Sequence, residues 1–139
     1  MSMMKVLALL GALTPAAALA HDAAGHGGAA PLPVVSDVMT KALKDYPGKE
    51  ITLISVDYPP GTVEPIHHHD AHAVVYVLQG TIVMGVKGGK EQTLKAGDTF
   101  YEGPDDIHTV GRNASQTEPA KFVVFILKDA KKPLVMTGP

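Results

Sequence analysis

The sequence predicts a small, single-domain, all-β protein whose short strands form a barrel or a sandwich, and we expect a single barrel. The chain has 139 residues, which is enough for one domain with its own core. From residue 50 onward, short runs rich in Val, Ile, Thr, Phe and Tyr alternate with turns rich in Gly, Pro and Asp. This part of the chain has no long helical pattern that would cover a parallel sheet and no internal repeat.

Residues 1–20 have the pattern of a signal peptide. Lys5 precedes an apolar stretch from Val6 to Leu13, and Ala18-Leu19-Ala20 then supplies small residues on both sides of Leu19, as at a cleavage site. The apolar stretch is too short for a membrane-spanning helix. We therefore expect export, to the periplasm in a bacterium, and no membrane segment after cleavage. A hydrophobic first strand is the alternative interpretation.

The rest of the chain divides into a leader and a folded domain. Residues 21–33 are rich in Ala and Gly and predict a flexible leader, so the domain covers residues 34–139. Residues 34–46 are ambiguous, because Ser36 can cap a short helix that Pro47-Gly48 would end. Eight strands are then expected, at residues 50–58, 63–69, 73–78, 82–86, 92–94, 99–101, 107–112 and 121–127. The tail, residues 128–139, is expected to be an edge strand or loose.

Charge and cysteine content exclude several classes of function. The formal net charge is −2 and no basic patch occurs, which argues against binding to nucleic acid or to an anionic membrane surface. The chain has no cysteine, so disulfides, thiolate ligands and cysteine nucleophiles are excluded. Any metal site must therefore use imidazole, carboxylate or water.

The histidines are the main candidates for a functional site. Side chains alternate faces along a strand, so His67 and His69 point to one side while His68 points to the other. If His108 enters from an adjacent strand on the same side, three imidazoles converge inside the barrel. Such a group suits one divalent first-row transition metal, with Fe, Mn, Zn, Ni and Cu not distinguished. The alternative is a set of polar core histidines without a metal.

The residues around these histidines resemble the two motifs of the cupin family. The first motif runs Gly, five residues, His-x-His, three residues, Glu, six residues, Gly, and its matched positions are Gly61, His67, His69 and Gly80. The second runs Gly, five residues, Pro-x-Gly, two residues, His, three residues, Asn, and its matched positions are Gly97 and His108, with Asn113 one place beyond the expected Asn. The resemblance covers residues 50–127. It implies a jelly-roll-like double-stranded β-helix in which three motif histidines and the Glu bind one metal ion.

The chain departs from the first motif at Ala73, which occupies the Glu position and has no donor atom. His72 is adjacent and is a candidate fourth ligand if the turn at Asp70-Ala71 rotates it inward; Asp70 is a weaker candidate. A three-histidine site with open water positions is the other arrangement. Without an anionic ligand the ion keeps its full charge, which favours anionic substrates or hydroxide.

Several other side chains are weaker candidates. Tyr76 and Gln79 can line the barrel, but we expect Tyr76 in the core, and Arg112 is expected at the surface rather than clamping a substrate carboxylate. Three acidic residues precede His108 and can orient it or transfer protons, although a solvated loop is the favoured interpretation: Glu102, Asp105 and Asp106.

Two classes of function follow from these residues. The first is a metal-dependent enzyme, such as an oxygenase or isomerase, acting on a small molecule. The second is a non-catalytic binding or sensing module for a small ligand or a metal, or one without metal. A homodimer is expected from the resemblance and from exposed edge strands.

Overall fold

The computed structural model describes residues 28–138, and this part of the chain contains ten strands and no helix. The predicted signal peptide and most of the predicted leader lie outside the described residues. No helix in the described part of the chain is long and apolar enough to cross a membrane.

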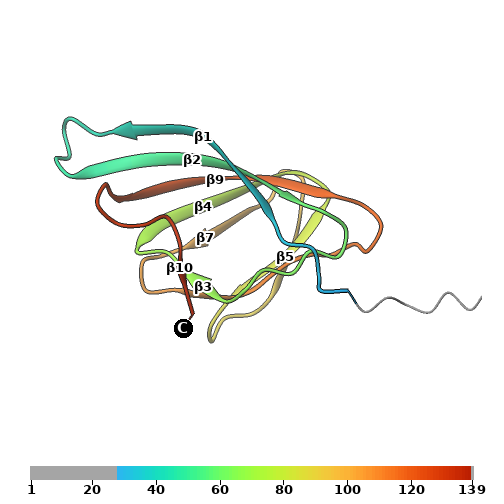
Figure 1. Cartoon of the computed structure of the whole chain (residues 1–139). Helices are drawn as coiled ribbons and strands as arrows, with labels where there is room; N and C mark the ends of the chain where they lie inside the picture. Colours follow the sequence, from blue (N-terminus) through green and yellow to red (C-terminus); the bar gives the residue numbers. More distant parts are fainter. Residues whose placement is uncertain (1–27, 139) are drawn as a thin grey trace, which may run out of the picture.

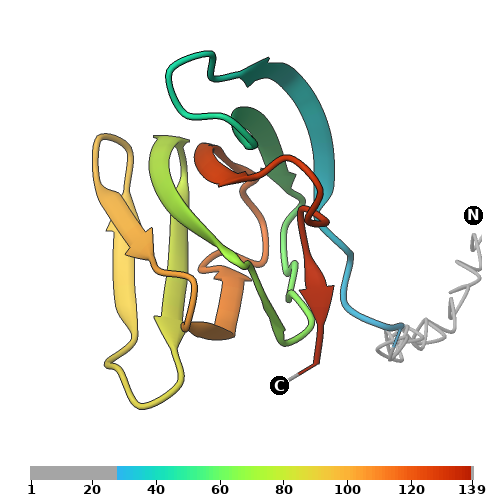
Figure 2. The same ribbon diagram turned by 90° about the vertical axis from the view of Figure 1, so that its left-hand side faces the viewer.

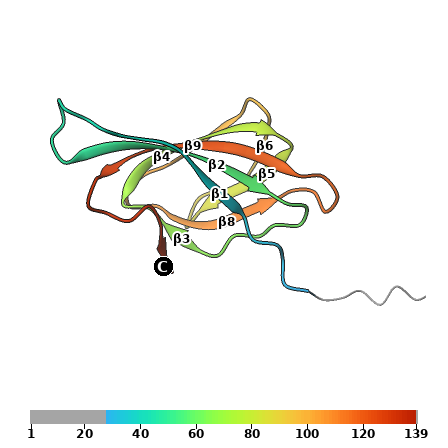
Figure 3. The ribbon, with the colours of Figure 1, turned by 45° about the horizontal axis from the view of Figure 1, so that its top comes forward.

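The strands form two antiparallel sheets of five strands each, and Figures 1 and 3 show them as two layers. The first sheet has the order β1 (Val34–Ala42), β2 (Lys49–Tyr58), β9 (Ala120–Asp129), β4 (Ala71–Gln79) and β7 (Thr99–Glu102). The second has the order β10 (Met136–Thr137), β3 (His67–His68), β8 (Ile107–Asn113), β5 (Thr81–Val86) and β6 (Gln92–Lys95). The neighbours in each order include strands far apart in sequence, as in a jelly-roll-like double-stranded β-helix. The sheets face each other without a hydrogen-bonded ladder between them in the described chain, so the barrel is not closed.

The core lies between the two sheets and follows from alternation along the strands. In β4, Ala71, Ala73, Val75 and Val77 are buried while the residues between them are exposed. β9 supplies Phe122, Val124 and Ile126 from its inward face in the same way, and β2 supplies its alternate residues. This inward face also holds the polar residues of the candidate site.

The predicted strands are all present, with differences at both ends and at residues 63–69. The ambiguous segment 34–46 forms β1 rather than a helix, because it pairs along β2 with one register shift between Asp37 and Met39. Residues 63–69 form only the two-residue strand β3 and an isolated bridge at Val63. The tail forms the two-residue strand β10, which pairs with β3 at His67 and His68; Figure 2 shows it in red near the C-terminus.

Gly80 shows why a motif position requires glycine. It turns the chain from β4 into β5 with a φ of 74°, which L side chains rarely adopt. An added Cβ would lie 2.6 Å from the carbonyl oxygen of Pro119. The close approach of this turn to the start of β9 therefore disfavours every larger residue.

Candidate metal centre

Strand pairing brings the predicted histidines together. β3 pairs with β8 so that His67 lies directly opposite His108, and His69 follows β3 in the short link to β4. The ring centroids of His67 and His108 are 4.8 Å apart, and those of His67 and His69 are 5.0 Å apart. The three imidazoles therefore converge on one end of the space between the sheets, as the spacing predicted.

Each imidazole uses one nitrogen to hydrogen-bond a backbone carbonyl. The Nδ1 of His69 donates to the oxygen of Leu134 at 2.6 Å, and the Nδ1 of His67 donates to that of Pro65 at 2.9 Å. His108 uses its Nε2 to donate to the oxygen of Val110 at 2.6 Å. A neutral imidazole that donates from one nitrogen presents a lone pair at the other. The lone pairs of the three rings thus lie on His67 Nε2, His69 Nε2 and His108 Nδ1.

Two of these lone pairs face each other at a distance that one metal ion would span. His67 Nε2 and His108 Nδ1 are 3.3 Å apart, and neither has a proton to share when both rings are neutral. Two nitrogens bound to one ion at about 2.0–2.1 Å in a near-tetrahedral arrangement lie about 3.3 Å apart. The described residues include one group of donor atoms within 4.8 Å of one another that can hold a metal ion: Glu64, His67 and His108.

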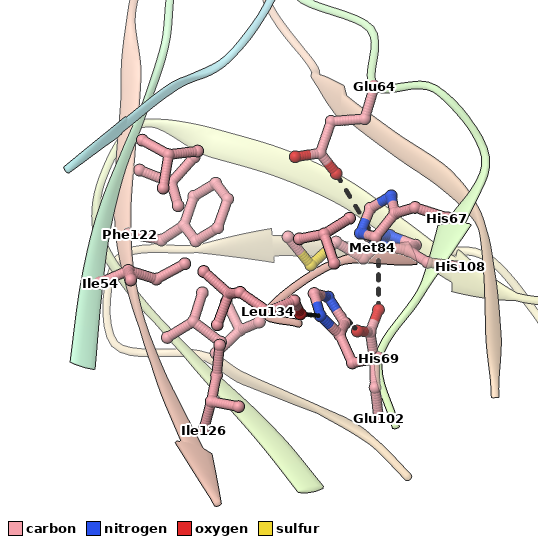
Figure 4. Close-up of a pocket in the computed structure, with 15 residues that line it drawn as sticks. Ile54, Glu64, His67, His69, Met84, Glu102, His108, Phe122, Ile126 and Leu134 are labelled. Atoms are coloured by element: carbon pink, nitrogen blue, oxygen red, sulfur yellow. Dashed lines mark hydrogen bonds and ion pairs between the residues drawn. The ribbon is translucent and has the colours of Figure 1, made fainter. Parts of the chain in front are cut away.

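Two glutamates flank His108 on opposite sides, as Figure 4 shows. Glu64 Oε2 is 3.7 Å from His108 Nδ1 and Glu102 Oε1 is 3.0 Å from the same atom. The other oxygen of Glu102, Oε2, is 3.7 Å from His69 Nε2. Within the described chain, Glu102 Oε1 receives no hydrogen bond, because the adjacent His108 nitrogen is itself an acceptor. With Glu102 ionised and both rings neutral, no proton lies between Glu102 Oε1 and His108 Nδ1 or between His108 Nδ1 and His67 Nε2.

Burial shifts the pKa values of the cluster toward neutral side chains. Burial, with Glu64 and Asp106 nearby, raises the pKa of Glu102 to about 7. Burial and the neighbouring His67 lower the pKa of His108 to about 4, and burial also lowers the pKa of His69. Burial raises the pKa of Glu64 despite the opposing effect of His67. Acceptors that are costly to leave unpaired in a buried space require a cation or a proton between them.

The residues present fit a divalent first-row metal ion. Imidazole nitrogen and carboxylate oxygen are ligands that such ions accept, and the orphaned Glu102 Oε1 and the facing lone pairs provide the electrostatic need for a cation. The backbone bonds of the three rings fix their orientation, as outer hydrogen bonds do in many metal sites.

His72 is not brought into this cluster. It is exposed on the outer face of β4, where its Nδ1 and the hydroxyl of Tyr101 form a hydrogen bond of 2.7 Å. The expected inward rotation at Asp70-Ala71 does not occur, because β4 begins at Ala71 and alternates regularly from there. Asp70 pairs instead with Lys132 at 3.0 Å. His68 points away from the cluster and its Nδ1 donates to the oxygen of Gly138.

Burial and polar contacts decide the expectations for the weaker candidates. The expectation that Tyr76 lies in the core is wrong, because its side of β4 faces outward and 46% of its surface is exposed. The expectation that Glu102 belongs to a solvated loop is also wrong, since it ends β7 with only 4% of its surface exposed. Asp106 caps the turn before β8 by accepting a hydrogen bond from the backbone N–H of Gly103, and Asp105 is exposed.

Arg112 forms an ion pair with Glu91 at 3.0 Å and does not line the cavity.

Sequence reasoning missed Glu64. It lies three residues before His67 inside the first motif, and its backbone is hydrogen-bonded to Gly111 of β8. An added Cβ at Gly111 would overlap the carboxylate of Glu64, so this glycine makes room for it. A single acidic residue in a loop is a weak signal, and only its spacing from His67 pointed to the site.

A cavity opens beside the cluster and is lined mainly by apolar side chains (Figure 4). It encloses about 480 Å³ with its open mouth included. Its polar lining consists of Glu64, His67, His69, Glu102 and His108, and the remaining lining residues are apolar. Glu64 and His67 also line an adjoining hollow, so they lie toward the opening.

The two-sheet fold and the internal histidine–glutamate group define a double-stranded β-helix protein with a group that can hold a metal. The model of the "Cupin domain" family matches residues 54–126, and the chain belongs to this family. Among curated proteins, none matches this sequence.

Solved structures show the same fold. An uncharacterized conserved protein with a double-stranded beta-helix domain from Klebsiella pneumoniae subsp. pneumoniae MGH 78578 is 20% identical, with a TM-score of 0.61 over 77% of this chain and 84% of that one. An oxalate oxidase in complex with the substrate analogue glycolate is 22% identical, with a TM-score of 0.58 over 76% of this chain and 54% of that one. The DMSP lyase DddQ from Ruegeria pomeroyi DSS-3 is 20% identical, with a TM-score of 0.55 over 63% of this chain and 42% of that one. The chain therefore spans about half the length of these two enzymes or less.

Proposed function

We propose that this chain is an exported metal-binding cupin that holds one divalent first-row transition-metal ion and acts on a small molecule in the adjacent cavity. One observation carries the proposal: three imidazoles anchored on backbone carbonyls turn their lone pairs toward one another and toward two buried carboxylates. Burying such a group of acceptors costs free energy unless a cation or a proton lies among them. His67, His69 and His108 would hold the ion together with carboxylate oxygen.

The cavity supports a substrate with an apolar body and one oxygen-bearing end. Its walls come mainly from Val, Ile, Leu, Met and Phe side chains, and all its polar lining atoms lie at the histidine–glutamate end. No Lys or Arg of the described chain lines the cavity, so an anionic end of the substrate would have to face the metal site. A bound ion would supply Lewis acidity toward that end. Glu64, which lies toward the opening, is placed to accept or return a proton there.

The neighbouring enzymes are consistent with such a ligand. Oxalate oxidase and a DMSP lyase share this fold, and both names refer to small molecules. A small polar or charged head group in the cavity is therefore the class of ligand that we propose. The predicted signal peptide supports the exported location, which cell fractionation of the tagged full-length chain would test.

The same proposal includes a homodimer through the first sheet. β1 is an edge strand, and all nine of its residues are exposed. Val34, Val35, Val38 and Met39 each expose about half of their surface on it. An unpaired edge with apolar side chains favours pairing with a second copy. Light scattering of the purified chain would give the oligomeric state.

Elemental analysis of the chain purified without a histidine tag tests the metal site. We expect about one equivalent of a first-row metal, and its loss in His67→Ala and in His108→Ala. His72→Ala is the matched control, because this histidine lies outside the cluster and should leave the metal content unchanged. Full metal content in both cluster variants would refute the metal site.

A screen of the metal-loaded protein for oxygen uptake and for turnover of small carboxylic acids tests the activity. Turnover that is lost in the same two variants supports an enzyme. A metal-loaded protein that binds members of the screen without converting them refutes the catalytic part and leaves a binding module.

A further inference from the structure

The position that lacks the expected glutamate lies directly opposite another glutamate. Ala73 lies on the inward side of β4 and is fully buried, and the β4–β7 ladder pairs it with Glu102. Directly opposed residues of antiparallel strands have Cβ atoms about 4.5–5.5 Å apart and share a face of the sheet. The side chain of Glu102 therefore enters the space between the sheets beside the place where a glutamate at residue 73 would enter it.

The contacts of Glu102 fit a ligand rather than a structural ion pair. Its Oε1 is 3.0 Å from His108 Nδ1 and its Oε2 is 3.7 Å from His69 Nε2. Both nitrogens carry lone pairs, because their rings donate from the other nitrogen to Val110 and Leu134. The carboxylate thus lies between two imidazole acceptors with one oxygen that receives no hydrogen bond. In a structural ion pair the ionised carboxylate would receive a donor at that oxygen.

We infer that Glu102 is the carboxylate ligand of the metal site, moved across the ladder from the position of Ala73 to the neighbouring strand. This inference rests on the proposed metal site. The ion then has an anionic ligand, contrary to the expectation of an all-histidine site.

Glu64 has a different position and a different role. Its side chain is 14% exposed against 6% for Glu102, and it comes from the loop before β3 toward the opening of the cavity. Glu102 ends a strand whose backbone is held in a ladder, so its carboxylate is the better fixed of the two. Glu64, which belongs to the same donor group as His67 and His108, is the less firmly held donor and lies toward the opening, where a small molecule would enter.

A reciprocal exchange across the ladder tests the assignment. The affinity of the full chain for Zn²⁺ is measured by competition with a chelator, and the absorption spectrum of the Co²⁺ form reports the ligand set. Glu102→Ala is expected to weaken Zn²⁺ binding at least ~10–100-fold, the loss typical of groups that support a metal site from outside. The double variant Ala73→Glu with Glu102→Ala is expected to regain most of this affinity. Glu118→Ala, at an exposed site, is the control.

Each outcome bears on one of the two proposals. Wild-type affinity in Glu102→Ala, together with loss in His67→Ala and His108→Ala, overturns the assignment of Glu102 and leaves the metal site standing. A wild-type chain that binds neither ion overturns the metal site itself. If Glu102→Ala does not fold by circular dichroism, Glu102→Gln replaces it, and an unchanged Co²⁺ spectrum in that variant refutes the inference. A folded double variant that binds as weakly as Glu102→Ala refutes the exchange across the ladder.

Discussion

Replacing Glu102 with glutamine is expected to stabilise the metal-free protein at alkaline pH relative to wild type. Burial raises the pKa of this carboxyl from 4.5 to about 7, so the folded state binds its proton more tightly than the unfolded chain does. The free energy of unfolding therefore decreases as pH rises from about 4.5 through about 7, where the folded carboxyl must ionise without a partner. Glutamine has no proton to lose and avoids this cost.

The magnitude follows from the shift in pKa. At 1.36 kcal/mol per pKa unit, the rise from 4.5 to about 7 corresponds to about 3 kcal/mol. His108 acts in the opposite sense, because burial lowers its pKa from 6.5 to about 4 and its contribution is lost as pH falls through that range. In wild type the contributions of Glu102 and His108 offset each other, and those of Glu64 and His69 also act in opposite senses; Glu102→Gln lacks only the contribution of Glu102. The variant should therefore become more stable relative to wild type as pH rises.

Urea unfolding in the presence of a chelator measures this difference at about pH 4 and about pH 8. We expect the free energy of unfolding of Glu102→Gln minus that of wild type to increase by about 3 kcal/mol between the two conditions. Glu118→Gln, at an exposed position, is the control and should show no such increase. A difference that is the same at both pH values would refute the reasoning. Saturating metal should remove the advantage of the variant, because the cation supplies the missing partner.

Three further predictions concern the metal site and one turn. Metal affinity is expected to fall about tenfold per pH unit below about 7, because Glu102 must release its proton; competition titrations that give a flat profile would contradict this. Gly111→Ala should weaken metal binding at least ~10-fold, because the added Cβ displaces the carboxylate of Glu64, and unchanged binding by calorimetry would argue against that contact. Gly80→Ala should lower the free energy of unfolding by more than about 1 kcal/mol and by more than Gly88→Ala does. Both glycines have positive φ, but only the first meets a backbone carbonyl; equal losses in urea unfolding would show that the close approach contributes nothing.

Local patterns in the sequence suffice for the three histidines of the candidate site. The i, i+2 spacing of His67 and His69 places both rings on one side, and the second motif places His108 on a later strand. The structure brings these three together. His72 is excluded by the same alternation, because β4 begins at Ala71 and its inward residues are the odd-numbered ones. The expectation of an inward-rotated His72 required a bulge that the strand does not have.

The positions of the two buried carboxylates, Glu102 and Glu64, could not be predicted from the residues next to them in the sequence. Nothing in the residues around Glu102 shows that it lies opposite Ala73, because the register of β7 on β4 depends on how both strands pack in the sheet. Its burial likewise depends on the facing sheet, so an acidic residue before Gly103-Pro104 looked like part of a solvated loop. Glu64 reaches the cluster only because Gly111, nearly fifty residues later, leaves space for it.

The sequence by itself determined the all-β class, the positions of the strands after residue 50, the cupin resemblance and the three histidines of the site. These follow from alternation and turn chemistry, which act over a few residues. Only the tertiary structure decided that residues 34–42 pair as a strand, that the two sheets face each other without closing, and that two glutamates flank His108. The physical reason is that pairing, register and desolvation are set by strands distant in sequence, and these decide which charged side chains are buried together.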